Sequence, residues 1–186
     1  MPNHITNKLT IIGSENEIKE VLEFIKIDNE KIGTIDFNKI TPMPKWIFSG
    51  NLGREEEQKY GKQNCWYEWC CKNWGTKWNA YDQEFNKETN TLYFDTAWSG
   101  VPELISKLAW IFPNVKIDYS WADEDLGYNV MKYSFKDTEV WCEEIESGSK
   151  EAYELAFDIK GIEPKEYGYV FDEEKNTYVY DEEYEG

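Results

Sequence analysis

Apolar positions near the N-terminus follow first the spacing of a strand and then the spacing of a helix. From His4 to Ile12 the later half alternates and then runs apolar, as in a half-buried strand. Gly13 ends this strand, and Ser14 with Glu17 has the arrangement of a capping box. The apolar positions that follow at helical spacing are Ile18, Val21, Leu22 and Ile25. The pattern therefore predicts a strand followed by an amphipathic helix.

Further along the chain the pattern predicts two strands, a helix and two more strands. The segments 77–85 and 91–98 are aromatic and β-branched and flank a polar turn, which is typical of a hairpin. Residues 101–112 carry a helical apolar stripe, and residues 115–121 alternate apolar and polar side chains. A last strand is expected near 128–135, after an acidic turn.

The region between the first helix and the hairpin is predicted to be an insertion. Residues 28–53 are rich in turn-forming residues, with a short strand expected around 34–37. Residues 54–74 have the pattern of one helix, in which Trp66 and Trp69 lie off the apolar stripe. Without this insertion the order is βαββαβ, which predicts a ferredoxin-like antiparallel sheet of the α+β class with both helices on one face.

After about residue 136 the composition changes. A short strand near 139–145, a helix at 149–159 and a tyrosine-rich hairpin within 167–180 are expected there. We therefore predict a ferredoxin-like domain over residues 1–135 and an acidic α+β extension over residues 136–186 that packs on it.

Charge is distributed unevenly along the chain. The 186 residues have a net charge of −17, from 37 acidic and 20 basic side chains. Residues 120–186 hold 20 acidic and 6 basic residues, a net of −14, whereas residues 1–119 hold 17 and 14, a net of −3. Phosphates would be repelled by the C-terminal third, which argues against direct nucleic-acid binding there.

The cysteines and the N-terminus indicate a reduced, cytoplasmic protein. The first residues contain no basic and apolar segments of a signal peptide, and no apolar run reaches the roughly 20 residues of a membrane span. Three of the four cysteines would point in different directions on the predicted helix, and no CxxC spacing is present. We expect reduced thiols, no metal and no cofactor. The cysteines are Cys65, Cys70, Cys71 and Cys142.

Several sequence motifs in order resemble a known family. They are Met1–Asn7, Phe37–Pro44, Asn73–Tyr81 and Phe94–Ser99. Together with the spacing into Tyr119 and the acidic turn after it, they are similar to the YubB ferredoxin-like family of plasmid- and phage-borne proteins, over about residues 1–135. The resemblance implies a ferredoxin-like domain and a mobile-element setting, and it supplies no catalytic residues to carry over.

One candidate ligand site lies where the predicted hairpin begins, directly after the predicted helix. Lys77, Trp78 and Asn79 follow a glycine and could form a small-molecule or nucleotide platform, with the lysine binding an anion. The alternative interpretation is structural: the glycine ends a helix and the neighbouring tryptophans enter the core.

Carboxylates and one histidine offer a third, catalytic interpretation. Asp82 and Asp95 fall on the two hairpin strands, and Glu124 follows a later strand, so together they could hold a metal for hydrolysis. His4 could act as a base, although no nucleophile motif accompanies it. Solvated carboxylates and a strand-entry histidine explain the same residues without chemistry.

We interpret the chain as a non-catalytic binding protein. Its acidic surface would imitate the phosphates of DNA and inhibit or modulate a basic, nucleic-acid-binding host defence protein. Exposed aromatic rings on the inserted helix would add contact area. The predicted partner-binding residues are Trp66, Trp69, Asp123, Glu124, Asp125, Glu143, Glu144, Asp172, Glu173 and Glu174.

Overall fold

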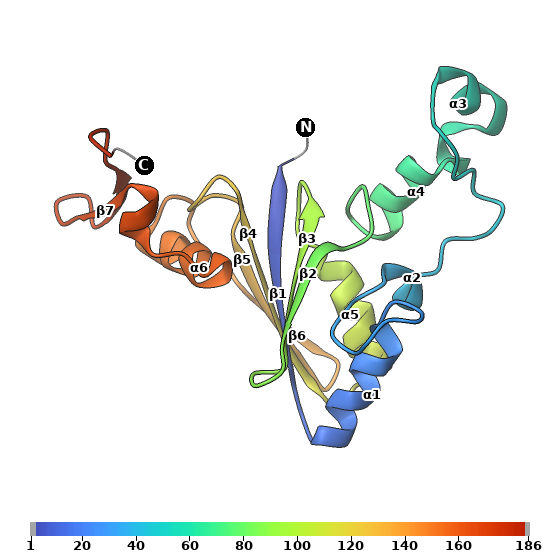
Figure 1. The fold of residues 1–186 in the computed structure, drawn as a ribbon, viewed down its shortest axis with the longest axis horizontal. Coiled ribbons are helices and arrows are strands. Elements are labelled where there is room, and N and C mark those ends of the chain that lie inside the picture. Colours follow the sequence, from blue (N-terminus) through green and yellow to red (C-terminus); the bar gives the residue numbers. More distant parts are fainter. Residues whose placement is uncertain (1–2, 185–186) are drawn as a thin grey trace.

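A twisted six-stranded sheet is the frame of the protein (Figure 1). The computed structural model describes residues 3–184. The strand order is β2-β3-β1-β4-β5-β6, and every pair of neighbours is antiparallel. The strands are β1 (His4–Ile12), β2 (Tyr81–Asn86), β3 (Thr91–Ala97), β4 (Lys116–Asp123), β5 (Met131–Lys136) and β6 (Glu139–Glu143).

Two helices cover one face of this sheet. They are α1 (Glu15–Ile25) and α5 (Pro102–Ile111), and they lie together on one side in Figure 1. With β1 to β4 they give the order βαββαβ and the sheet order of a ferredoxin-like fold, so the predicted fold class is confirmed. The Ser14–Glu17 capping box is formed at the start of α1 as predicted.

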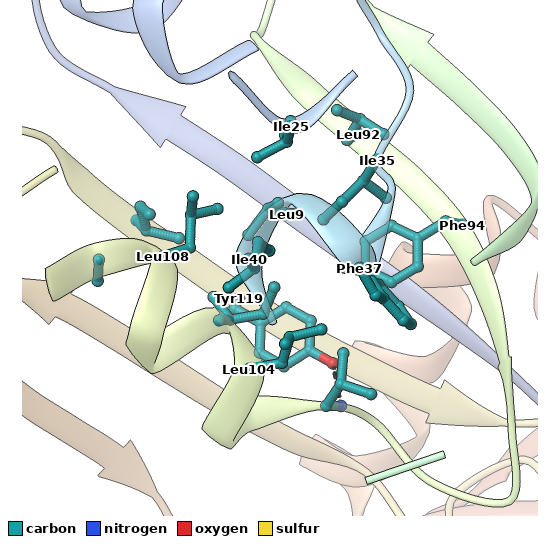
Figure 2. Packing of buried hydrophobic residues seen from close by; sticks show 14 of the residues in the cluster. Leu9, Ile25, Ile35, Phe37, Ile40, Leu92, Phe94, Leu104, Leu108 and Tyr119 are labelled. Carbon is teal, nitrogen blue, oxygen red and sulfur yellow. Dashed lines mark hydrogen bonds between the residues drawn. The ribbon is translucent and has the colours of Figure 1, made fainter. Parts of the chain in front are cut away.

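The segment that follows α1 in the chain fills the middle of the core (Figure 2). Ile35, Phe37 and Ile40 are buried among side chains of the sheet and of both helices. The prediction of a strand around 34–37 is wrong, and a single helical turn, α2 (Phe37–Ile40), begins at the end of this range. The Asp36 side chain accepts a hydrogen bond from the Asn38 N–H and begins this turn.

The insertion consists of three short helices rather than one. They are α3 (Arg54–Tyr60), the 3-10 turn η1 (Lys62–Asn64) and α4 (Trp66–Asn73). Gly61 separates them with φ of 82°, a left-handed conformation that interrupts an α-helix. The prediction of a single helix over residues 54–74 is therefore wrong, because the α-helix ends before Gly61 and a second one, α4, begins at Trp66.

The C-terminal segment lies on the opposite face of the sheet from α1 and α5 (Figure 1). Its helix α6 (Lys150–Lys160) contacts β4 and β1, and it is followed by η2 (Pro164–Tyr167) and a hairpin of β7 (Tyr169–Asp172) and β8 (Thr177–Tyr180). A second hydrophobic cluster joins α6 to the turn after β4. The sheet itself continues through β6, and the domain boundary at residue 135 stays a prediction. The residues of the second cluster include Ala122, Leu126, Val130, Tyr153, Ala156 and Phe157.

Candidate functional site

Polar side chains from five separate elements gather where the C-terminal end of α6 meets the sheet. Lys160, the last residue of α6, donates a hydrogen bond from its ammonium to the Thr6 hydroxyl at 3.2 Å. Asp95 lies directly opposite Thr6 in the β1–β3 register. We call the group the Lys160 cluster. Its members are His4, Thr6, Tyr81, Asp82, Asp95, Glu124 and Lys160.

Burial shifts the ionisation of both central charges of the Lys160 cluster. Burial raises the pKa of the Asp95 carboxyl, an effect partly opposed by the Thr6 hydroxyl and the Lys160 ammonium. Burial likewise lowers the pKa of Lys160, against the attraction of the nearby carboxylates. Partly buried charges with shifted pKa values in a hollow are a common property of functional sites.

The surface around Lys160 is hollowed and carries an excess of carboxylates. Two adjoining hollows of about 380 and 280 Å³ share Thr6 and Lys160 in their walls. Asp82, Glu84 and Asp158 line the smaller hollow, and Glu124 lines the larger. We call these two hollows together the acidic groove. Asp158 is ion-paired with Lys8 at 2.6 Å, so Asp82, Glu84 and Glu124 carry the negative charge that remains around Lys160. This excess favours a positively charged group.

A local irregularity of β2 brings Asp82 to the acidic groove. The β2–β3 register shifts between Tyr81 and Glu84. Asp82 sits within this bulge with φ of 47°, a left-handed conformation that aspartate tolerates better than most residues. An exposed carboxylate at this end of the hairpin is the result.

His4 is hydrogen-bonded in the Lys160 cluster to a tyrosine and not to a nucleophile. Its Nδ1 atom lies 2.8 Å from the Tyr81 hydroxyl oxygen. This hydroxyl donates a hydrogen bond to the Thr96 carbonyl. Burial and the neighbouring carboxylates raise the pKa of Tyr81 to about 12, so this hydroxyl stays protonated at neutral pH. The pair therefore anchors the start of β1 against β2 and β3.

The three carboxylates of the hydrolase hypothesis approach one another without forming a metal-binding geometry. Asp82, Asp95 and Glu124 are all in the Lys160 cluster. Within residues 3–184, however, no group of three or more His, Cys, Asp or Glu side chains is placed to hold a metal ion. The ammonium of Lys160 lies among these carboxylates, where it offsets part of their charge.

The segment containing Lys77, Trp78 and Asn79 is held by contacts within the protein. The Lys77 ammonium lies 4.4 Å from the centre of the Trp78 ring and 5.7 Å from that of Trp98, as in cation–π pairs. The Asn79 amide oxygen accepts from the Phe37 N–H, so this side chain joins the hairpin to α2. These contacts favour the structural interpretation of the segment.

Four of the residues predicted to bind a partner are buried or half-buried: Trp66, Trp69, Asp123 and, in the β7–β8 turn, Asp172. Trp69 is only 9% exposed and packs edge-on against Trp74. Trp66 is half-buried, and its indole N–H donates to the Gly50 carbonyl. Asp123 is buried and accepts hydrogen bonds from Asn3 and Asn129. The prediction that Trp66 and Trp69 form an exposed patch is therefore wrong. Because the helix is interrupted at Gly61, α4 buries side chains on more than one side.

The remaining predicted acidic residues lie on the surface in three places. They occupy the turn after β4, the end of β6 with the residue beyond it, and the β7–β8 turn. Asp172 is half-buried, and hydrogen bonds from the Lys175 and Glu174 N–H groups within the turn lower its pKa. The exposed residues are Glu124, Asp125, Glu143, Glu144, Glu173 and Glu174, of which Glu143 is ion-paired with Lys132.

Large apolar side chains are exposed close to these acids in the sequence. Tyr128 is 53% exposed and follows the turn after β4, and Trp141 is 49% exposed on β6. Phe171 is exposed beside the β7–β8 turn. Every residue of β6, which is an edge strand, is exposed. Aromatic side chains among carboxylates are a common composition of protein-binding surfaces.

Sequence reasoning missed several residues of the acidic groove. Asp158 lay near the end of the predicted helix and Lys160 just beyond it, neither in a motif. Thr6 and Glu84 were ordinary strand residues. The alternation along β1 indicated which residues share a face with Thr6. It did not indicate that the end of α6 would cover that face.

The fold and its surface define a ferredoxin-like domain with a helical insertion and an acidic C-terminal segment. Residues 74–181 match the family described as the ferredoxin-like domain in Api92-like protein, and the chain belongs to this family. The match continues beyond residue 135, where the sequence resemblance ended, and includes α6 and the final hairpin. No curated protein matches the chain, and neither does any solved structure. In the described part of the chain, no helix is long and apolar enough to cross a membrane.

Proposed function

We propose that this protein acts by binding, and that its partner is a basic, nucleic-acid-binding protein of a host defence system. The observation that carries the proposal is the acidic groove, in which carboxylates from β2 and the turn after β4 lie around Lys160. The carboxylate that α6 contributes, Asp158, is already paired with Lys8. A lysine or arginine side chain of the partner that entered the groove would gain several opposite charges at once.

The charge outside the acidic groove supports the same class of partner. Residues 120–186 have a net charge of −14, and six of the predicted acidic residues are exposed. Spaced carboxylates on a protein surface can occupy the positions that DNA phosphates occupy on a basic protein. Such a surface speeds association with a positively charged partner and makes the association sensitive to salt.

The biological setting rests on the sequence resemblance to plasmid- and phage-borne proteins. A mobile element gains from a protein that blocks a nucleic-acid-binding defence protein of its host. Such blocking needs no catalytic residues, because occupation of the DNA-binding surface is sufficient. The proposal is therefore a non-catalytic inhibitor or modulator that imitates DNA.

The test is displacement of basic proteins from immobilised DNA. Host lysate is loaded on DNA-cellulose, the full-length protein is applied, and the eluted proteins are identified by mass spectrometry. We expect a defined DNA-binding protein to be released and to bind the purified chain with an affinity that falls as salt is raised from 50 to 200 mM, conditions chosen on the order of physiological strength.

Charge-reversal variants locate the binding surface. Asp82→Lys with Glu124→Lys tests the acidic groove, and a second variant reverses the exposed pair Glu173 and Glu174. Glu55→Lys with Glu68→Lys, at exposed positions of α3 and α4, is the matched control. We expect the first two variants to lose roughly tenfold or more in affinity and the control to change little. The absence of any released protein, or a partner indifferent to salt and to all reversals, would contradict the proposal.

A further inference from the structure

A hollow beside α1 lies on the other side of the sheet from the acidic groove. Its volume is about 900 Å³, and it runs between α1, the loop after α1 and the β2–β3 turn. Because α1 has 11 residues, a groove along it is roughly 16 Å long. This volume falls within the range of small-molecule sites. We call it the α1 groove.

The floor of the α1 groove is apolar and comes from three elements. Ile18 and Leu22 of α1, Ile32 of the following loop and Phe85 of β2 line it. Gly33 allows the loop to close against β2: its φ is 114°, and a Cβ atom there would lie 2.7 Å from the Cβ of Phe85. The close approach of loop and strand therefore depends on this glycine, and it keeps the floor assembled.

The rim of the α1 groove carries four lysines and three glutamates, and one of the lysines is ion-paired with a glutamate. Lys19, Lys31 and Lys87 are exposed, and none of them forms an ion pair within the described residues. Lys26 also lines the groove but is paired with Glu23 at 2.7 Å. Unpaired ammonium groups around an apolar floor contrast with the strong acidity of the rest of the chain.

We propose that the α1 groove binds a small amphiphilic anion, that is, a ligand with an apolar body and a phosphate, sulfonate or carboxylate head. The floor would cover the apolar body and remove it from water. The lysines of the rim are flexible point charges that can meet one anionic head from several directions. Beside the one lysine–glutamate pair, the lining holds three more lysines and two more glutamates, and this excess of one positive charge favours an anion over a cation.

The α1 groove is independent of the proposed partner-binding surface. It lies beside α1, whereas the acidic groove lies beside α6 on the opposite face of the sheet (Figure 1). A small molecule and a basic protein could therefore occupy the protein together. Failure of one proposal leaves the other untouched.

The test is a fluorescence titration of the full-length protein with 1-anilinonaphthalene-8-sulfonate, an aromatic anion. N-phenyl-1-naphthylamine, which has a similar body and no charge, is the second probe. We expect saturable binding of the sulfonate at one site, and competition by laurate or by adenosine monophosphate distinguishes an acyl from a nucleotide body. Weakening by salt is expected for the charged probe only.

Matched variants separate the rim from the floor. The triple change Lys19→Gln, Lys31→Gln and Lys87→Gln should weaken the sulfonate roughly tenfold and leave the uncharged probe nearly unchanged. Ile32→Asn should weaken both probes, because it removes apolar floor. The control is the triple change Lys45→Gln, Lys59→Gln and Lys72→Gln, at exposed lysines outside the groove.

Three results would overturn this inference. It is overturned by the absence of saturable binding, or by a triple variant that binds the sulfonate as tightly as the unchanged protein. Equal weakening by the triple control would also overturn it, since the effect would then reflect net charge alone. If the triple variant does not fold, as judged by circular dichroism, Lys87→Gln in the exposed turn gives the same comparison with a smaller change.

Discussion

Removal of one buried hydroxyl should destabilise the fold measurably. Tyr119 is 1% exposed, and its hydroxyl lies between the core strands and the start of α5 (Figure 2). It accepts a hydrogen bond from the Val101 N–H and donates one to the Asn7 amide oxygen, each at 2.6 Å. Asn7 in turn donates to the Phe94 carbonyl and the Thr96 hydroxyl. Burial raises the pKa of Tyr119 far above its ordinary value, so the hydroxyl keeps its proton.

The Tyr119→Phe change leaves two buried polar groups without their partner. An unsatisfied buried donor or acceptor costs about 1–3 kcal/mol, and a small part of this is regained by local relaxation. We therefore expect the free energy of unfolding to fall by about 2–4 kcal/mol. That is a large share of the roughly 5–15 kcal/mol that stabilises a typical domain.

Urea unfolding followed by tryptophan fluorescence measures this effect. Tyr128→Phe is the control, because the Tyr128 side chain is 53% exposed and its loss of a hydroxyl should change stability by less than about 0.5 kcal/mol. A Tyr119→Phe protein as stable as the control would refute the reasoning. It would mean that water or a rearranged Asn7 satisfies the groups that this hydroxyl joins.

Three further predictions concern packing, charge and helix capping. Gly100→Ala should cost about 1–3 kcal/mol, because the added Cβ meets the buried Trp121 ring; thermal denaturation measures it, and an unchanged Tm contradicts it. Asp95→Asn should stabilise the protein at pH 7.5. Folding raises the pKa of the Asp95 carboxyl above its ordinary value of about 3.9. The free energy of unfolding therefore falls as the pH rises from this ordinary pKa to the pKa of the folded protein. The gain should therefore vanish near pH 3.5, and an equal gain at both pH values would exclude this cause. Ser149→Ala should cost about 1 kcal/mol in urea unfolding, because it removes the side-chain cap of α6, and no loss would show the cap to be dispensable.

The sequence determined most of the elements through local patterns. The alternation in β1 and β4 and the apolar stripes of α1 and α5 were sufficient to predict the sheet and the helices that cover it. The capping box of α1 fixed the start of that helix. The insertion was predicted less well. Gly61 weakened the helical pattern, but only its left-handed φ of 82° in the folded chain separates α3 from α4.

The candidate sites depended on which elements meet in space. Asp95 and Lys160 are separated by many residues, and no local pattern connects a strand carboxylate with the end of a distant helix. Their proximity follows from the position of α6 on the sheet face left open by α1 and α5. The α1 groove likewise exists because a loop and a hairpin turn close on one helix. Periodicity along a chain reports which side of an element is apolar, whereas the neighbours of its polar side are set by tertiary packing.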